Sequence, residues 1–138
     1  MPAFLLDTNV VSELRRVRPH QGVMNWLATL AANEIFVSAV TFGEIQRGVE
    51  ETRRTDWAKA QEIERWLDAV GGSFPILALD GDMFRECARL LHGRSKAHLE
   101  DARIAAAASV RGLTVATRNI ADFRVFGVPL FNPFGFKG

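Results

Sequence analysis

Five short apolar segments alternate with longer segments of helical periodicity, and this alternation limits the folds that the chain can adopt. The short segments are too brief for helices and are rich in branched or aromatic residues, so they predict strands. They are residues 3–6, 35–37, 74–79, 113–116 and 128–131. Helical patterns lie between them, at residues 20–32, 39–52, 56–70, 82–91 and 99–111. Strands and helices in alternation predict an α/β fold, with a central parallel sheet flanked by helices on both faces.

Residues at the ends of these segments support the boundaries. Ser38 and Asp80 are placed to cap the helices that follow them, and Gly112 suits the left-handed position that ends a helix. Residues 105–108 are a run of alanines, which we interpret as good helix formers. Residues 48–57 are the most polar part of the chain. We expect them to join two helices at the surface, with their charges solvated.

Length and composition limit the class of protein. The chain has 138 residues, which suits a single domain spanning residues 1–138. Its 48% of hydrophobic residues can form a core, and its net charge of +1 excludes nucleic-acid binding by general phosphate neutralisation. Cys87 is the single cysteine, and the apolar run at residues 2–6 is too short for a signal peptide or a membrane span. These features predict a cytoplasmic protein that has no internal disulfide and no membrane partner.

Asp7 is the sharpest single feature of the sequence. It follows Phe4, Leu5 and Leu6 directly, so it lies at the carboxyl end of a strand that we expect to be buried and central. That edge of an open parallel sheet is where ligands bind. The alternative is that Asp7 caps a helix over residues 8–14, as aspartate often does.

Asp101 stands at the start of a predicted helix and on its apolar face. Ile104, Ala105 and Ala108 follow at spacings of three, four and seven residues, which places the carboxylate on the same side as these apolar residues. A carboxylate in that position must be paired, coordinated or stabilised by the helix N-terminus. Coordination and a cap-like role both remain open for Asp101.

Glu44 and Asp122 are weaker candidates when each is taken alone. Glu44 follows Thr41 by three residues, which would suit a capping box, but Ser38 is the better cap and leaves Glu44 about two turns into the helix. Periodicity does not decide whether Glu44 is buried, because the main apolar stripe of that helix points elsewhere. Asp122 follows a predicted strand by a few residues, where turn formation explains it equally well.

Taken together, these four acids follow pieces of chain that a parallel fold brings to one edge of the sheet. Clustered carboxylates raise one another's pKa unless a cation shares them, and oxygen ligands are what Mg²⁺ or Mn²⁺ prefers. Such an ion activates water and stabilises the charge that develops on a phosphodiester during in-line attack. We treat His20, His92 and His98 as surface or helix-end residues, because they lack the spacing of metal ligands.

Four blocks of the sequence resemble PIN-domain ribonucleases, and more narrowly the VapC-type toxins of bacterial toxin–antitoxin pairs. The blocks are FLLDTNVVSE at residues 4–13, VSAVTFGE at 37–44 with Gly48, DARIAA at 101–106, and ATRN at 116–119 with Asp122-Phe123 and Asn132-Pro133. The resemblance covers nearly the whole chain in the right order. It implies a PIN fold and an endoribonuclease that requires Mg²⁺ or Mn²⁺.

The resemblance also implies roles for individual residues. Asp7, Glu44, Asp101 and Asp122 would form the acidic site, with Asp7 and Asp101 matching the most reliable metal ligands. Some relatives place an aspartate where this chain has Asn119, and others use the aspartate three residues further on. We therefore assign Asp122 as the fourth acid and Thr117 and Asn119 as accessory residues that position the metal or a water.

The same resemblance implies a homodimer and a small antitoxin protein whose C-terminal tail covers the site. DNA would be bound only indirectly, through the antitoxin. RNA would be the substrate, and Arg15, Arg16 and Arg18 are placed just beyond Asp7 to contact its phosphates, although ordinary surface charge explains them equally well. Trp26, Trp57 and Trp66 suit core or interface packing, and Trp26 and Leu30 look like exposed apolar positions for self-association.

Two other classes of function fit parts of the sequence. Domains that accept a phosphoryl group also keep an aspartate at the end of the first strand, but they need a later lysine. Lys59, Lys96 and Lys137 do not follow predicted strands, and Asn9 stands where the phosphatases want a second aspartate. The other alternative is a non-catalytic regulatory or scaffold domain in which the acids are only caps.

Overall fold

The computed structural model describes residues 2–138 and contains one parallel sheet of five strands. The strands lie in the order β3-β2-β1-β4-β5. Their bounds are β1 Phe4–Leu6, β2 Ile35–Ser38, β3 Ile76–Leu77, β4 Thr114–Ala116 and β5 Leu130–Phe131. Every neighbouring pair is parallel, and β1 is central and fully buried. The predicted parallel sheet and the central place of the first strand are therefore confirmed.

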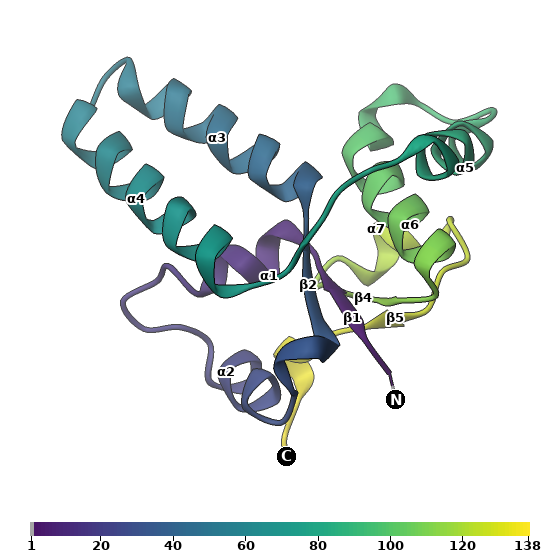
Figure 1. Cartoon of the computed structure of the whole chain (residues 1–138), viewed down its shortest axis with the longest axis horizontal. Coiled ribbons are helices and arrows are strands. Elements are labelled where there is room, and N and C mark those ends of the chain that lie inside the picture. The colour runs from purple at the N-terminus through teal and green to yellow at the C-terminus, as the bar shows by residue number, and fades with distance from the viewer. Residues whose placement is uncertain (1) are drawn as a thin grey trace.

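Seven α-helices cover the two faces of this sheet. They are α1 Thr8–Glu13, α2 Gln21–Ala28, α3 Ala39–Arg53, α4 Trp57–Ser73, α5 Gly81–Leu91, α6 Leu99–Arg111 and α7 Ile120–Arg124. In Figure 1, α1, α3 and α4 lie on one side of the strands and α5, α6 and α7 on the other. Short 3-10 helices occupy Ala32–Glu34, Lys96–His98 and Pro133–Gly135. No helix within residues 2–138 is both long and apolar enough to cross a membrane.

Alternating side chains of the strands divide the core into two halves. Leu5 and Val115 belong to a cluster that includes buried residues of α5, α6 and α7, whereas Phe4 and Leu6 belong to a second cluster with Trp26 of α2. Successive residues of a strand point to opposite faces, so three residues of β1 are enough to serve both clusters. The expectation of helices on both faces is thus confirmed.

The cap positions agree with the sequence. The Ser38 hydroxyl accepts a hydrogen bond from the N–H of Val40, and the Asp80 carboxylate accepts one from the N–H of Met83. Gly112 has a φ of +66° and ends α6 in the left-handed conformation that glycine adopts most easily. His20 is the N-cap residue of α2, and its ring accepts a hydrogen bond from the N–H of Gly22.

Several boundaries differ from the prediction. The edge strands β3 and β5 have two residues each, and they begin later than predicted because Pro75 and Pro129 directly precede them and proline supplies no N–H to a ladder. The helix expected over residues 20–32 ends at Ala28. No helix is predicted over residues 120–124, where a turn is one explanation of Asp122, but they form the short helix α7. A helix of five residues has too few positions to show periodicity in a sequence.

The polar segment at residues 48–57 is more structured than expected. Helix α3 continues through it to Arg53, whose guanidinium donates hydrogen bonds to Glu50, Gln61 and Glu64. Glu64 and Gln61 belong to α4, so this contact joins the two long helices. The interpretation that all these charges are merely solvated was wrong for Arg53, because only the tertiary fold brings α4 beside it.

The tryptophans occupy three different environments. Trp26 is 3% exposed and meets Phe4 edge to face, with ring centroids 4.9 Å apart. Trp66 is half-buried, whereas Trp57, at the start of α4, is 62% exposed. The expectation that Trp26 offers an exposed surface for self-association was therefore wrong, because its ring fills the core between α2 and the sheet. Trp57 is not a core residue.

The alanine run of α6 is a packing feature as well as a good helix former. Ala105, Ala106, Ala107 and Ala108 are all completely buried in the cluster between the sheet and α5. We predict that Ala106→Leu lowers the free energy of unfolding by about 1–3 kcal/mol, because added methylenes strain a closely packed core. The matched control is Val110→Leu on the exposed side of the same helix, which should change it by less than about 0.5 kcal/mol. Urea unfolding measures both, and equal midpoints for the two variants would contradict this reading of α6.

Candidate active site

A polar hollow opens at the carboxyl ends of the central strands. It has a volume of about 620 Å³. Its lining residues are Asp7, Thr8, Asn9, Ser12, Glu13, Arg15, Arg16, Glu44, Asp101, Arg118 and Asn119. The chain turns to one side of β1 for β2 and β3, and to the other side for β4 and β5. The hollow therefore lies at the point where strand order reverses, which is where open α/β sheets bind ligands.

Asp7 is held at the floor of this hollow by two donors. One carboxylate oxygen, Oδ1, accepts a hydrogen bond from the N–H of Thr8 at 2.8 Å, and Oδ2 accepts one from the Thr117 hydroxyl at 2.8 Å. The side chain is 5% exposed, and this burial raises the pKa of the carboxyl despite the two hydrogen bonds. Asp7 is the N-cap residue of α1 and also a wall of the hollow, so the two sequence readings of it are compatible.

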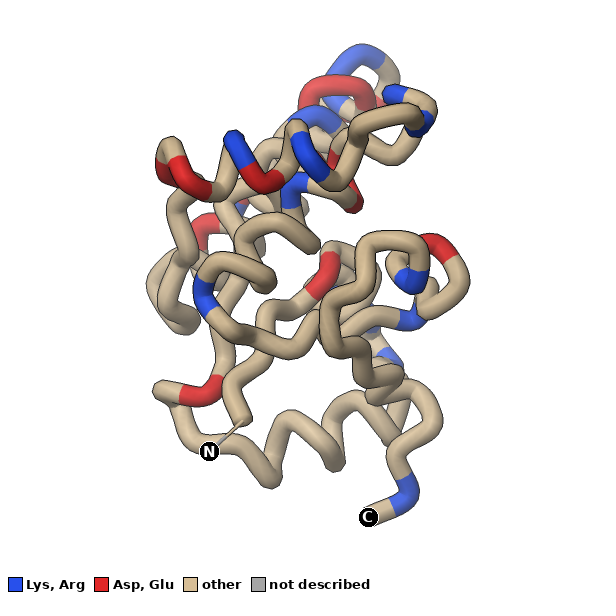
Figure 2. The backbone as a smooth tube through the Cα atoms, turned by 90° about the vertical axis from the view of Figure 1, so that its right-hand side faces the viewer, with Lys and Arg blue, Asp and Glu red and all other residues tan. Residues whose placement is uncertain are grey.

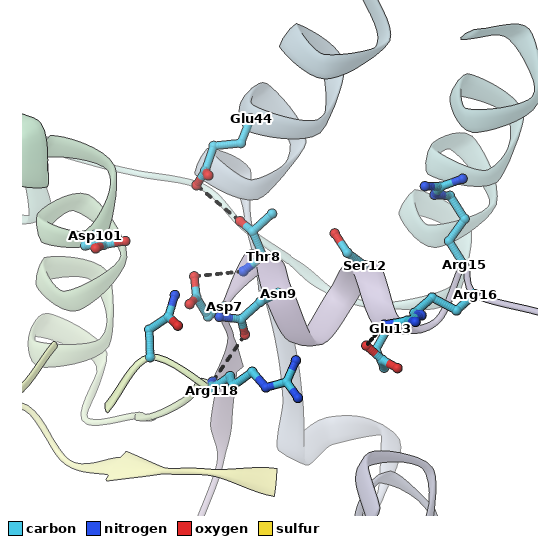
Figure 3. A pocket seen from close by; sticks show the side chains of 11 residues that line it. Asp7, Thr8, Asn9, Ser12, Glu13, Arg15, Arg16, Glu44, Asp101 and Arg118 are labelled. Carbon is cyan, nitrogen blue, oxygen red and sulfur yellow. Dashed lines mark hydrogen bonds and ion pairs between the residues drawn. The ribbon is translucent and has the colours of Figure 1, made fainter. Parts of the chain in front are cut away.

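Glu44 reaches the hollow from the second turn of α3 (Figure 3). Its Oε1 accepts a hydrogen bond from the Thr8 hydroxyl at 3.1 Å, and the hydroxyls of Thr8 and the fully buried Thr41 are 3.0 Å apart. Partial burial raises the pKa of Glu44, and the negative charges of Glu100, Asp7 and Asp101 raise it further. Thr8 therefore links two acids, through its N–H to Asp7 and through its hydroxyl to Glu44.

Asp101 enters from the first turn of α6, opposite α1 in Figure 3. The residues that share its face, Ile104, Ala105 and Ala108, are fully buried, as the spacing predicts. Desolvation, together with the negative charges of Asp7 and Asp122, raises the pKa of Asp101 from 3.8 to about 6. The electrostatic interaction with His98 acts in the opposite direction and lowers the pKa of Asp101.

Three of the four acids that line the hollow form no ion pair within the described residues. The ion pairs among residues 2–138 do not include Asp7, Glu44, Asp101 or Asp122. Glu13, the last residue of α1, is the exception, since it is buried and is paired with Arg16 at 3.7 Å. Its Oε1 accepts the N–H of His20 at 2.8 Å and so ties the segment after α1 to the start of α2. The remaining carboxylates thus keep their mutual repulsion.

The structure separates the two candidates for the fourth acidic position. Asn119 lines the hollow, and its N–H donates to the Thr117 hydroxyl at 2.9 Å. Asp122 is exposed in the first turn of α7 and lines a separate hollow with Arg94, Ser95 and His98. Its charge nevertheless raises the pKa of both Asp7 and Asp101. Asp122 therefore influences the site electrostatically without lining it.

Of the three arginines predicted to contact RNA, two line the hollow and one does not. Arg15 and Arg16 line the hollow, whereas Arg18 is exposed and outside it. Sequence reasoning did not assign a role in the site to five other lining residues, which are Thr8, Asn9, Ser12, Glu13 and Arg118. A signal existed for the first four, because the helix that begins after Asp7 carries them past the site within its first two turns. Arg118 follows directly on Thr117 at the end of β4.

The donor atoms of the three acids are of the type that Mg²⁺ and Mn²⁺ prefer. Carboxylate oxygens are available from Asp7, Glu44 and Asp101, and no lysine or arginine of the described chain neutralises them. Within residues 2–138, however, no three Asp, Glu, His or Cys side chains are arranged closely enough to hold a metal ion as they stand. The chemistry of the ligands fits such an ion, whereas the geometry is more open than a closed metal site.

This fold and this acidic hollow match a known family. The model of the PIN domain matches residues 4–127. The chain belongs to the PIN-domain family. Within the family it is of the VapC and FitB type, the toxins of toxin–antitoxin systems, since its similarity to such proteins extends over nearly its whole length.

Three relatives illustrate how far the similarity of this PIN domain extends. Toxin FitB of Neisseria gonorrhoeae is 33% identical over 138 aligned residues, which cover 94% of this chain and 97% of FitB. VapC ribonuclease Y4jK of Sinorhizobium fredii is 32% identical, with 94% and 96% covered. The crystal structure of FitAcB from Neisseria gonorrhoeae contains a chain that superposes with a TM-score of 0.77 at 31% identity, over 96% of this chain and 99% of that one.

The raised pKa of Asp101 predicts a pH-dependent effect of neutralising it. A carboxyl with a raised pKa in the folded state favours folding while it is protonated, and this contribution is lost as the pH rises from about 4 to about 6. In metal-free protein, Asp101→Asn should therefore raise the free energy of unfolding at pH 7.5 by about 1 kcal/mol, after allowance for solvent screening. The gain should vanish near pH 4.

Thermal unfolding in EDTA at both pH values measures this effect. The matched control is Asp68→Asn, which removes an exposed carboxylate from α4 and should leave the melting temperature unchanged at both pH values. A gain for Asp101→Asn that is equal at pH 4 and pH 7.5 would show that it does not come from the charge.

Proposed function

We propose that this PIN domain is a Mg²⁺- or Mn²⁺-dependent endoribonuclease that acts as the toxin of a toxin–antitoxin pair. A single domain spanning residues 1–138 would carry the activity, with RNA phosphodiester bonds as the substrate. The observation that supports the proposal most strongly is the set of three carboxylates, Asp7, Glu44 and Asp101, which line one hollow and form no ion pair within the described residues. The relatives include a protein named VapC ribonuclease.

Asp7 and Asp101 would be the direct metal ligands, with Glu44 and Asp122 completing the acidic site. A bound divalent ion supplies activation of water and stabilisation of the charge that develops on the phosphodiester. The raised pKa values of Asp7, Glu44 and Asp101 support this assignment, because burial, with a smaller contribution from neighbouring negative charges, disfavours the ionised carboxylates, and a bound cation would favour them.

The neighbouring hydroxyls prepare these acids for that role. Thr117 and the N–H of Thr8 fix both oxygens of Asp7, so its carboxylate is oriented before any ligand arrives. The Thr8 hydroxyl orients Glu44 in turn, supported by Thr41. Partners of this kind fix ligand orientation and raise the activity of metal sites. Thr117 and Asn119 therefore serve as accessory residues in the proposal.

RNA would be held by local charge. Figure 2 shows acidic and basic residues interspersed over the part of the backbone farthest from the two chain ends, and the net charge of the chain is +1. Arg15 and Arg16 line the hollow beside the acids, and Arg18 belongs to the same exposed segment. We propose that these three arginines contact phosphates that flank the cleaved bond.

We further propose a cognate antitoxin and a homodimer as protein partners. Among the similar solved structures is one described as FitAB bound to an IR36 DNA fragment, which matches over 98% of this chain with a TM-score of 0.70 and 29% identity. By analogy, this chain would bind DNA only through its antitoxin. The cytoplasm is the proposed place of action, since it contains the RNA substrate and keeps Cys87 reduced.

Asp7→Asn provides the direct test of the proposal. Purified wild-type protein should cleave single-stranded RNA in Mg²⁺, and the variant should lose at least about a hundredfold in rate, because it removes a ligand charge. Mg²⁺ should also raise the melting temperature of the wild type and not that of the variant. Asp68→Asn, which changes an exposed acid outside the hollow, should behave as the wild type in both assays. If Asp7→Asn retains full activity, Asp7 is not a ligand.

A metal titration separates this function from a scaffold role. A scaffold domain without a metal site should show no cleavage and no stabilisation by millimolar Mg²⁺. That combination in the wild type would reject the enzyme and favour the scaffold.

Asp122→Asn and Asn119→Ala together test the fourth position. If Asp122 supplies negative charge to the site, Asp122→Asn should slow single-turnover cleavage at saturating Mg²⁺ by about tenfold or more, and Asn119→Ala should do less. The reason is that an amide orients a water or ligand without adding charge. Greater damage by Asn119→Ala would assign the fourth position to the residue that lines the hollow.

A further inference from the structure

Arg118 is a cation of the hollow that none of the roles above uses. It lies between Thr117 and Asn119, just beyond the end of β4, and its side chain is exposed at the rim. Among the residues that the structure describes, it forms no ion pair. An arginine that stands beside several acids and pairs with none of them is free to bind another anion.

The main chain at Arg118 is fixed to the same elements that carry Asp7. The N–H of Arg118 donates to Oδ1 of Asn9 in α1 at 3.3 Å. On one side, the Thr117 hydroxyl donates to Asp7, and on the other, the N–H of Asn119 donates to that hydroxyl. The position of Arg118 is therefore set relative to the acids by hydrogen bonds that involve three successive residues.

The side chain of Arg118 is held by an aromatic ring. Its guanidinium carbon lies 4.3 Å from the ring centroid of Phe134, which is within the range of a cation–π contact. Phe134 is itself fixed, since its N–H donates to the Asn132 side chain at 3.0 Å and its ring centroid lies 5.0 Å from that of His20. It also packs against the core cluster that contains Trp26. Stacking orders the guanidinium but leaves its N–H groups free to bind an anion.

The other arginines of the hollow lack this support. Arg16 is paired with Glu13, and Arg15 has no aromatic partner in the described chain. Figure 3 shows Arg118 and Glu44 on opposite sides of Asp7, with Arg15 and Arg16 farther along α1. A strand of RNA that places one phosphate at the acids would therefore meet Arg118 on the side away from Glu44.

We propose that Arg118 binds an RNA phosphate adjacent to the cleaved bond, and that Phe134 is the positioning residue that orients its guanidinium. Guanidinium groups match phosphate oxygens with two parallel hydrogen bonds, and a preordered one loses less entropy on binding. The inference rests on the proposed ribonuclease function, because it takes RNA as the ligand of the same hollow.

The test measures RNA binding separately from cleavage. All proteins carry Asp101→Asn and are assayed in EDTA, so that a fluorescein-labelled single-stranded RNA is bound but not cut. Fluorescence anisotropy between 50 and 200 mM salt gives the Kd and the slope of log K against log salt concentration. Arg118→Gln should weaken binding about tenfold and reduce the size of the slope by about 0.7, the value expected for one lost phosphate contact to a single strand. The control Arg111→Gln, at the exposed end of α6, should change neither quantity.

Phe134 variants test the positioning role. Phe134→Leu removes the ring but keeps Arg118, so it should weaken binding about threefold while the salt slope stays at its original value. Phe134→Tyr keeps the ring and should restore the original Kd. A loss of affinity in Phe134→Leu that Phe134→Tyr does not restore would overturn the positioning role.

Two results would overturn the role of Arg118. One is an unchanged Kd and slope in Arg118→Gln, and the other is a lower melting temperature with an unchanged slope, which would mark a purely structural residue. Failure of the proposed function would be distinct, because it would appear as absence of RNA cleavage by the wild type in Mg²⁺. If the wild type cleaves RNA and Arg118→Gln binds it normally, the proposed ribonuclease function is supported and the proposed role of Arg118 is rejected.

Discussion

β1 and β4 pair side by side at the centre of the sheet, and the whole site depends on this pairing. The register places Leu6 opposite Ala116, so the next residues, Asp7 and Thr117, meet at the carboxyl edge although they are 110 residues apart in sequence. The N–H of Asp7 donates to the carbonyl of Ala116 at 2.9 Å and continues the ladder into the site. Because a shift by one residue would turn every side chain to the other face, core packing on both sides fixes this register and thereby the site.

The same edge concentrates charge that the fold itself does not neutralise. Asp7 is buried, and Asp101 extends from the start of a helix whose buried face consists of small and branched apolar residues. The threonine hydroxyls orient the carboxylates but supply no positive charge. Natural proteins retain such unfavourable clusters at functional sites, because strongly perturbed acids in a cleft are suited to ligand binding or catalysis. The site thus reduces stability in the absence of a cation, and the dense cores on either face of the sheet compensate for that cost.

Positive charge is arranged around the acids without cancelling them. Glu13 engages Arg16, and Phe134 supports Arg118, so two of the arginines on the hollow are occupied by partners that are not acids of the cluster. This separation keeps the centre acidic and the rim basic. An acidic centre suits a divalent cation and a basic rim suits phosphates, so one hollow is complementary to both kinds of ligand.

The sequence by itself determined the alternation of strands and helices, the parallel sheet and the caps at Ser38, Asp80 and Gly112. These features depend on local signals: apolar runs, helical period and the conformational preferences of single residues. It also identified Asp7 and Asp101, because one follows a buried strand and the other shares a helix face with apolar residues.

The tertiary structure alone decided which neighbours those residues meet. It buried Trp26 against Phe4, joined Arg53 to Glu64 across two helices, placed Asn119 rather than Asp122 on the hollow, and stacked Arg118 on Phe134. Each of these contacts depends on how separate elements pack together, and in several of them the partners are far apart in the chain. Local propensity carries no information about such partners, because their distance is set by sheet order and by the packing of helices on its two faces.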